Sequence, residues 1–121
     1  TTPSLSFDAA INFLNGNNRA DFIEAKISAD YVDNVTTATW ATLNATWSEG
    51  KNWTFVNSGA IDLKDYVGKK VRLAFAYKST SACAPTIEIK NISVQSLRMV
   101  IMQMFICIRK CLKMRWKRLL L

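Results

Sequence analysis

Aromatic and amide side chains that could recognise a sugar are spread over residues 31 to 53. A flat ring can stack on the C–H face of a pyranose, and amide or carboxylate groups can bind its hydroxyls. Both kinds of group occur in loop-like stretches here, and together they form a candidate carbohydrate-binding set: Tyr31, Asp33, Asn34, Asn44, Trp47, Asn52 and Trp53. We expect Trp47 to be the most exposed ring of the set, whereas Trp53 fits a site and a core equally well. The in-facing positions of Trp40 and Phe55 predict core side chains.

Two pairs of acids raise the alternative of glycoside hydrolysis. Asp30 with Asp33, or Asp62 with Asp65, could act as a general acid and a nucleophile across a glycosidic bond. Both pairs also lie at a strand end or beside a turn, where solvated carboxylates are usual. The chain has no histidine, which removes the commonest general base and every Ser-His or Cys-His nucleophile arrangement. We therefore predict a non-catalytic protein that uses no cofactor.

The cysteines predict neither a disulfide framework nor a metal site. Three cysteines, Cys83, Cys107 and Cys111, cannot all be paired within one chain because their number is odd. Two of them are four residues apart, but two thiols without a histidine fall short of a tetrahedral zinc shell. We expect all three thiols to be unpaired and no metal to be bound.

The elements that would position these residues are β-strands. Apolar and polar residues alternate with a period of two, as expected when one face of a strand is buried, over residues 5–13, 23–31, 71–77 and 87–94. The β-branched stretch 39–46 and the segment 53–56 predict two further strands. The alternation is cleanest in 71–77, so we expect Leu73 and Phe75 at the centre of the core. About six strands with no helical period before residue 97 predict an antiparallel β-sandwich.

Charge divides the chain into a body and a tail. Residues 1–95 contain nine basic and nine acidic side chains, whereas residues 96–121 contain seven basic side chains and no acid. The isoelectric point near 9.6 therefore reflects the tail alone. We expect one sandwich domain over residues 1–95 followed by a separate tail, and the balanced body argues against a nucleic-acid partner.

The tail has the pattern of a basic amphipathic helix over residues 96–121. Apolar residues recur at spacings of three and four and bases occupy another arc, although Arg115 interrupts the apolar arc. The apolar run from Met99 to Ile108 has about half the length needed to cross a bilayer. Three interpretations remain open: a coding artefact, a helix docked on the body or on a second copy, and a helix that binds an anionic membrane surface.

Six segments of the body occur in an order shared with a known family. They are Leu5–Ala10, Ile27–Tyr31, Ala38–Leu43, Trp53–Leu63, Tyr66–Tyr77 and Ile87–Asn91. This series resembles the jelly-roll domains of Bacteroidetes surface proteins, the choice-of-anchor and cleaved-adhesin-like group with a galactose-binding-like fold. The resemblance implies an extracellular or cell-surface module of a larger lipoprotein that binds glycans or mediates adhesion. A structural spacer beside other domains of a parent protein is the alternative.

The chain departs from that family in three ways. Family members usually have strands upstream of the Leu5–Ala10 segment, so the resemblance implies a partial domain whose open sheet edge could recruit partners, including a second copy. The family's closing strand often reads Trp-Glu-Ile-Asp-Asn, whereas Ile87 and Lys90 replace its aromatic residue and its second acid here. The resemblance therefore implies no metal-binding role at Lys90. The tail has no counterpart in the family.

Overall fold

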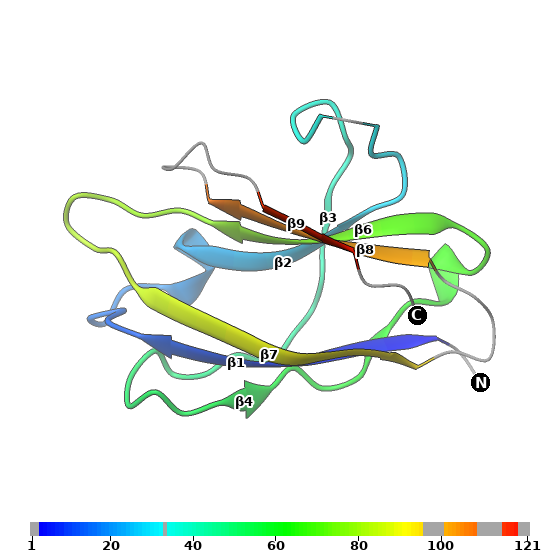
Figure 1. The fold of residues 1–121 in the computed structure, drawn as a ribbon. Helices are drawn as coiled ribbons and strands as arrows, with labels where there is room; N and C mark the ends of the chain where they lie inside the picture. The colour runs from blue at the N-terminus through cyan, green and yellow to red at the C-terminus, as the bar shows by residue number, and fades with distance from the viewer. Residues whose placement is uncertain (1–2, 33, 96–100, 109–114, 119–121) are drawn as a thin grey trace.

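The chain folds as a β-sandwich of two sheets (Figure 1). The computed structural model describes residues 3–32 and 34–95 and the backbone of 101–108 and 115–118. The elements are β1 (Ser4–Asn12), the 3-10 helix η1 (Arg19–Asp21), β2 (Ile23–Ser28), β3 (Ala41–Thr42), β4 (Val56–Asn57), β5 (Ile61–Asp62), the 3-10 helix η2 (Lys64–Tyr66), β6 (Lys70–Tyr77), β7 (Thr86–Gln95), β8 (Ile101–Ile108) and β9 (Arg115–Arg118). Among these residues there is no α-helix, and no helix there is long enough to cross a membrane.

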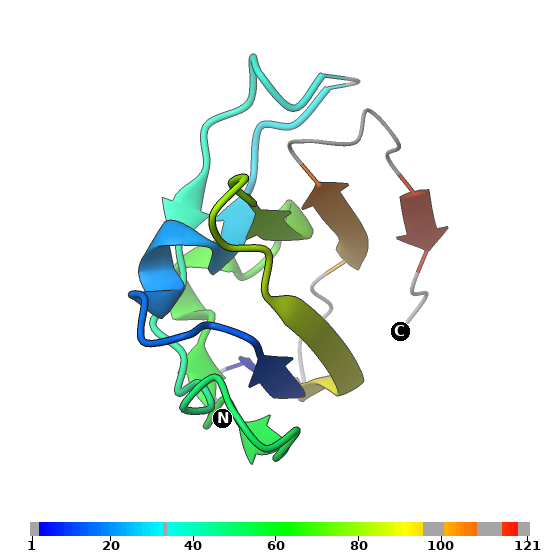
Figure 2. The ribbon, with the colours of Figure 1, turned by 90° about the vertical axis from the view of Figure 1, so that its left-hand side faces the viewer.

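The two sheets form two layers that face each other (Figure 2). In the first, the β1 sheet, β1 pairs with β7 along one edge and with the short strands β4 and β5 along the other. In the second, the β6 sheet, the strand order is β3-β2-β6-β8-β9. The described pairs are antiparallel except β6 with β8, because β7 lies between them in sequence but in the other layer.

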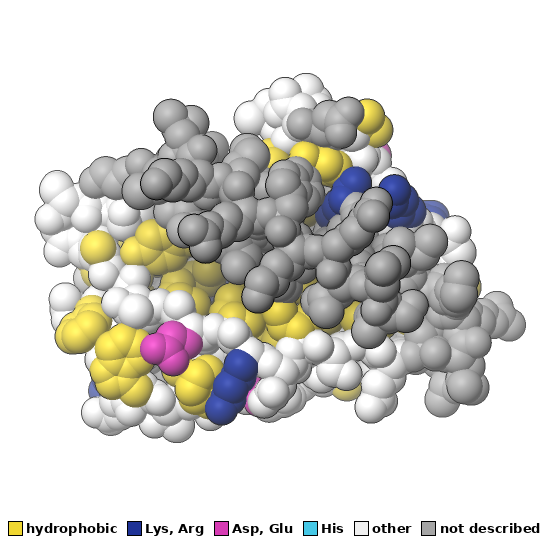
Figure 3. Space-filling model, in the orientation of Figure 1, with side chains coloured by type: hydrophobic (Ala, Val, Ile, Leu, Met, Phe, Trp, Pro, Cys, Tyr) yellow, Lys and Arg dark blue, Asp and Glu magenta, His cyan; other side chains and the backbone are white. Residues whose placement is uncertain are grey.

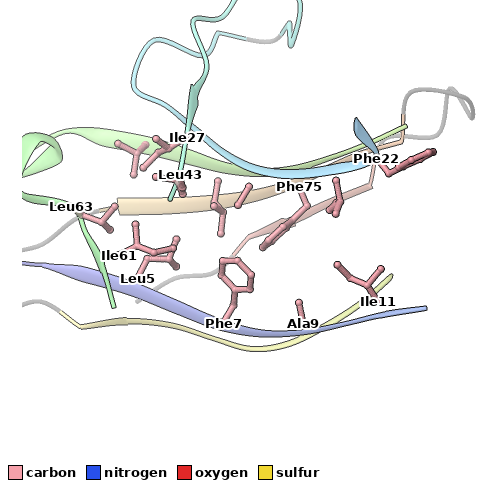
Figure 4. Close-up of a cluster of buried hydrophobic side chains, with 14 of the residues drawn as sticks. Leu5, Phe7, Ala9, Ile11, Phe22, Ile27, Leu43, Ile61, Leu63 and Phe75 are labelled. Atoms are coloured by element: carbon pink, nitrogen blue, oxygen red, sulfur yellow. The ribbon is translucent and has the colours of Figure 1, made fainter. Parts of the chain in front are cut away.

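The core lies between the inner faces of the two sheets. Leu5, Phe7 and Ile11 of β1 and Phe75 of β6 point into the space between the sheets (Figure 4). These four residues and Leu73 of β6 are all at 1% exposure or less. The rings of Phe7 and Phe75 meet edge to face with centroids 5.0 Å apart. The expectation that β6 supplies the centre of the core is confirmed.

Two buried serines complete the hydrogen bonding of β1 where β4 and β5 leave gaps. The Ser58 hydroxyl accepts a hydrogen bond from the Phe7 amide at 3.0 Å, and the Ser48 hydroxyl accepts one from the Ile11 amide at 3.1 Å. A buried backbone N–H without an acceptor is costly, so these hydroxyls take the place of a neighbouring strand. This side of the sheet is therefore closed by loops as well as by strands.

Several strand bounds differ from those expected. The stretch 39–46 contributes only the two-residue β3, while Ile61–Asp62 forms a strand that the alternation did not predict. With β3 so short, Trp40 lies in the preceding loop and is half-buried outside the core cluster, and Phe55 is likewise half-buried beneath the Lys90 ammonium. The expectation that these two rings belong to the core is wrong.

The tail does not show the expected amphipathic helix. Its described parts are β8, which extends the β6 sheet by pairing with β6, and β9, which pairs with β8. Residues 101–108 contain three isoleucines and one phenylalanine and no charged residue, a composition that favours a strand, and the edge of β6 offers it a partner. Cys111 lies outside the described residues.

Candidate functional site

Two loops at one end of the sandwich enclose a hollow and carry the most exposed ring pair. We call residues 12–17 and 48–54 the end loops. They line a hollow of about 380 Å³ with backbone and side chains of Asn12 to Asn17 and of Glu49 to Lys51. The Leu14 amide donates a hydrogen bond to the Gly50 carbonyl at 3.4 Å, so the two loops touch at their centre.

Phe13 and Trp53 form an exposed aromatic corner beside this hollow. Their side chains are 52% and 43% exposed, and their ring centroids are 5.7 Å apart with planes at 87°. An edge-to-face pair stabilises itself while leaving ring faces open to solvent. A single exposed ring is ordinary on a protein surface, but a fixed corner of two rings is a surface on which a ligand can stack.

The backbone holds the corner in an uncommon conformation. Phe13, Asn15, Asn52 and Trp53 all have positive φ angles, between 51° and 67°. Such conformations cost of order 1 kcal/mol or more for a residue with a side chain, and they persist only where the surroundings enforce them. Here both the amide and the side-chain Nδ2 of Asn17 donate to the Leu14 carbonyl at 2.9 Å.

Contacts from other segments also fix the end loops. Gly50 approaches Leu14 so closely that a Cβ at position 50 would lie 2.2 Å from the Leu14 Cδ1 atom. The buried Cys83 thiol donates to the Phe13 carbonyl at 3.6 Å, and Ser48 bonds β1 as described above. The expectation that Cys83 is unpaired is confirmed, and its position gives the thiol a role in the packing of the loop.

The polar groups of the hollow are amides together with one neutralised ion pair. Asn12 is half-buried, while Asn15 and Asn17 are exposed at its rim. Glu49 and Lys51 pair with each other at 3.5 Å on the solvent side. The hollow therefore has no net formal charge, and it offers hydrogen-bond donors and acceptors of the kind that bind hydroxyl groups.

The structure brings only part of the predicted set together. Asn52 and Trp53 lie in the end loops. Tyr31 and Asn34 lie in residues 31–40, which we call the outer loop. This loop connects β2 with β3 and projects from the β6 sheet (Figure 1). Asn44 is exposed on the segment that descends from β3, and Asp33 lies outside the described residues. Residues 31 to 53 therefore supply two separate surfaces.

Trp47 is less accessible than expected. Its ring packs against Phe7 at 5.4 Å and is half-buried at the rim of the core. The Arg19 guanidinium covers the ring at 5.0 Å and pairs with Glu24 at 3.0 Å. Because one side of the ring faces the core and a cation lies over it, Trp47 belongs to the packing of the sandwich.

The outer loop uses its polar and aromatic groups for internal contacts. The Trp40 indole N–H donates to the Val35 carbonyl at 2.9 Å, and the Arg72 guanidinium lies 4.8 Å from the centre of the Tyr31 ring. The side-chain oxygen of Asn34 accepts from both the amide and the hydroxyl of Thr36, which closes a local turn. These groups hold the loop in place.

Asp30 anchors the outer loop and also lines an open hollow of about 440 Å³, together with Thr39, Tyr66 and Lys69. Its carboxylate accepts from the Thr39 amide at 2.7 Å and from the Ser28 hydroxyl at 2.8 Å. The hydrogen bonds from Thr39, followed by that from Ser28, lower the pKa of the Asp30 carboxyl below its ordinary value. Asp62, from the other predicted acid pair, accepts a hydrogen bond from the Lys64 amide at 2.8 Å.

Phe13 is the site residue that the sequence analysis missed. The alternation predicted it as the last in-facing residue of a strand, but β1 ends at Asn12 and the positive φ of Phe13 turns the ring outward, while Leu14 is buried in its place. The turn-forming residues Asn15 and Gly16 were the available signal, since they show that the strand ends nearby.

Comparison with known proteins adds no family assignment. The chain matches no protein-family model, no curated protein and no solved structure. Among the residues that the structure describes, no group of three or more acidic, cysteine or histidine side chains could hold a metal ion. The likeness to the Bacteroidetes domains therefore stays a prediction that depends on the quoted segments.

Proposed function

We propose that this chain is a non-catalytic carbohydrate-binding module with a jelly-roll topology, and that the end loops form its binding surface. The observation that carries the proposal is the exposed Phe13–Trp53 corner, held by strained backbone beside an amide-lined hollow. Sugar recognition needs an apolar face for stacking and neutral polar groups for the hydroxyls, and both lie within this one end of the sandwich.

The charge of the end loops supports a neutral sugar as the ligand. Glu49 and Lys51 neutralise each other, and the remaining polar side chains around the hollow are amides. A uronic or sialic acid would need an unpaired cation to bind its carboxylate. In keeping with the resemblance of the body segments, we place the module at the cell surface or outside the cell, as one part of a larger protein that binds or adheres to glycans.

A glycan array probed with the full chain tests the proposal. We expect binding to neutral glycans, and loss of that binding in both Phe13→Ala and Trp53→Ala, with a melting temperature nearly equal to that of the parent chain. Stacking on one ring contributes about 2 kcal/mol at a binding hot spot, which corresponds to roughly a 30-fold loss of affinity.

Trp47→Phe serves as the matched control because it changes an aromatic residue outside the hollow. It should keep the glycan binding of the parent chain. If no neutral glycan binds, or if Trp53→Ala binds as well as the parent, the end loops are not a glycan site, and the chain would instead be a spacer between other domains.

A further inference from the structure

The two layers of the sandwich differ in width on the side of β7. The β6 sheet continues past β6 into β8 and β9, whereas the β1 sheet ends at β7 among the described strands. In Figure 2, β8 lies across from β7 and β9 lies farther out than β7, so no described strand of the β1 sheet faces β9. Among the described strands none pairs with the second backbone edge of β7, which is ten residues long, and we call this edge free.

The open side of the sandwich is apolar. A groove of about 350 Å³ runs along it, lined by Ile23, Phe75, Tyr77, Pro85, Thr86, Ile87 and Ile89. The inward row of β7, which comprises Ile87, Ile89, Ile92 and Val94, is only half-buried. Hydrophobic side chains are visible between the layers on this face in Figure 3. A strand added beside β7 would cover this row while pairing with the free edge.

The charged side chains on the outward face of β7 indicate which residues an added strand should have. Glu88 and Lys90 are both exposed and lie on either side of Ile89. Opposite charges directly across an antiparallel pair are favourable and like charges are not. The incoming strand should therefore have a basic residue opposite Glu88 and an apolar residue next to it that points into the groove. An acidic residue opposite Lys90 completes the pattern, but it matters less, because the Lys90 ammonium already lies over Phe55 and opposite Asp8 of β1.

We propose that the free edge of β7 binds an extended segment of another polypeptide by β-strand addition. Apolar and polar residues alternate in this segment. A basic residue pairs with Glu88, an apolar residue with Ile89 and an acidic residue with Lys90. A second copy of this chain is a poorer occupant. Pairing two β7 edges around a two-fold axis would bring both β6 sheets to the same side, where the β9 strands of the two copies, which lie farther out than β7, would collide.

The bulge in β7 limits the length of the pairing. The register with β1 shifts between Lys90 and Ser93, and Asn91 has a φ of 54°. A β-bulge disrupts an edge locally and discourages long uncontrolled pairing. The added strand should therefore pair mainly with Thr86–Lys90, which makes the interaction short and reversible.

A peptide with the sequence of residues 86–95 is a suitable probe. Aligned antiparallel about Ile89, its lysine faces Glu88 of the protein and its glutamate faces Lys90, whereas shifts of two residues either way bring like charges together. We expect saturable binding of the fluorescent peptide to the full chain. N-methylation of alternate peptide amides on the pairing edge should abolish it, because strand addition requires those N–H groups.

A charge exchange tests the register. Glu88→Lys should weaken binding of the peptide about fivefold at low salt, and a peptide in which the lysine equivalent to Lys90 is replaced by glutamate should restore it. Asp65→Lys, which makes the same change of charge at an exposed site in η2, should leave peptide binding unchanged. The expected pattern of loss and rescue would support the proposal.

Three results would overturn the proposal. They are the absence of saturable binding, equal binding of the N-methylated peptide, and a Glu88→Lys variant that binds both peptides equally. Sedimentation of the full chain tests whether a second copy of this chain occupies the β7 edge instead. A dimer that Glu88→Lys dissociates would make a second copy the partner and would refute binding of another polypeptide. Glycan binding at the end loops is unaffected by any of these outcomes.

Discussion

The outer loop and the end loops contain similar residues but use them in opposite ways. Each has two aromatic rings and several asparagine or threonine side chains. In the outer loop, Trp40 bonds the Val35 carbonyl and Arg72 covers Tyr31. In the end loops, Phe13 and Trp53 contact each other and remain about half exposed. Composition alone does not separate a loop that stabilises itself from one that presents a surface.

The difference between the two loops lies in what fixes the backbone. The outer loop is held by its own side chains and by the Asp30 carboxylate. The end loops are held from below, by the close approach of Gly50 to Leu14 and by Ser48 on β1. Because buried neighbours fix most of the conformation, the exposed Phe13 and Trp53 rings are not needed for folding and stay available to a ligand, whereas the Asn17 side chain also helps to hold the loop through the Leu14 carbonyl.

The largest expected effect comes from Gly50→Ala. The added methyl group would collide with Leu14, and the residue would have to keep a φ of 83°, which together should lower the free energy of unfolding by about 3 kcal/mol. Gly16→Ala is the matched control, because it also has a positive φ but no atom within 4 Å of its added Cβ. Urea unfolding measures both, and equal losses would show that the approach of Gly50 to Leu14 does not fix the end loops.

The next effect compares one ring from each loop. Trp40→Ala removes a half-buried ring and the indole hydrogen bond to Val35, so we expect a loss of about 2 kcal/mol in the free energy of unfolding. Trp53→Ala removes an exposed ring and should cost less than about 1 kcal/mol. Chemical denaturation of both variants provides the measurement. If Trp53→Ala lost more stability than Trp40→Ala, the binding role would pass to the outer loop.

The sequence predicts the long strands of this fold because their alternation is regular. β1, β2, β6 and β7 were each located, and the burial of Leu73 and Phe75 followed from period alone. The two-residue strands β3, β4 and β5 were misplaced or missed, since partners distant in the sequence define them. The roles of Ser48 and Ser58, whose hydroxyls accept hydrogen bonds from β1 amides, could not be predicted either, because these contacts follow no periodic pattern in the sequence.

The candidate site was only half predictable, for a local reason. Asn52 and Trp53 were identified by residue type, but Phe13 was assigned to the core because it continues the alternation of β1 by one residue. A single positive φ reverses that assignment, and alternation does not report φ. Trp47 was misjudged for the converse reason, because its contact with Phe7 joins residues forty positions apart.

A smaller effect concerns the attachment of the end loops to β1. Ser48→Ala removes the acceptor for the buried Ile11 amide and should cost about 1 to 2 kcal/mol in the free energy of unfolding. It should also weaken glycan binding, because residues 48–54 lose their anchor. Thr36→Ala removes an exposed hydrogen bond from the outer loop and should change stability by less than about 0.5 kcal/mol. Unchanged protection of the Ile11 amide in hydrogen exchange would contradict the role given to Ser48.

The smallest expected effect is a difference between the two loops in how their amide hydrogen exchange depends on pH. The pKa of Asp30 is lowered by its hydrogen bonds from Thr39 and Ser28, so its carboxylate holds the outer loop at any pH above the ordinary value of 3.8. That contribution should be lost as the pH falls below 3.8 through the lower pKa of the folded state. The Thr39 amide, which donates to Asp30, should then exchange faster with solvent, while the Leu14 amide, which donates to the Gly50 carbonyl, should keep its protection. Asp30→Asn provides the control, because it keeps a side-chain oxygen but has no carboxyl to titrate in this range. If the Thr39 amide of this variant shows the same pH dependence as that of the parent chain, another group holds the outer loop.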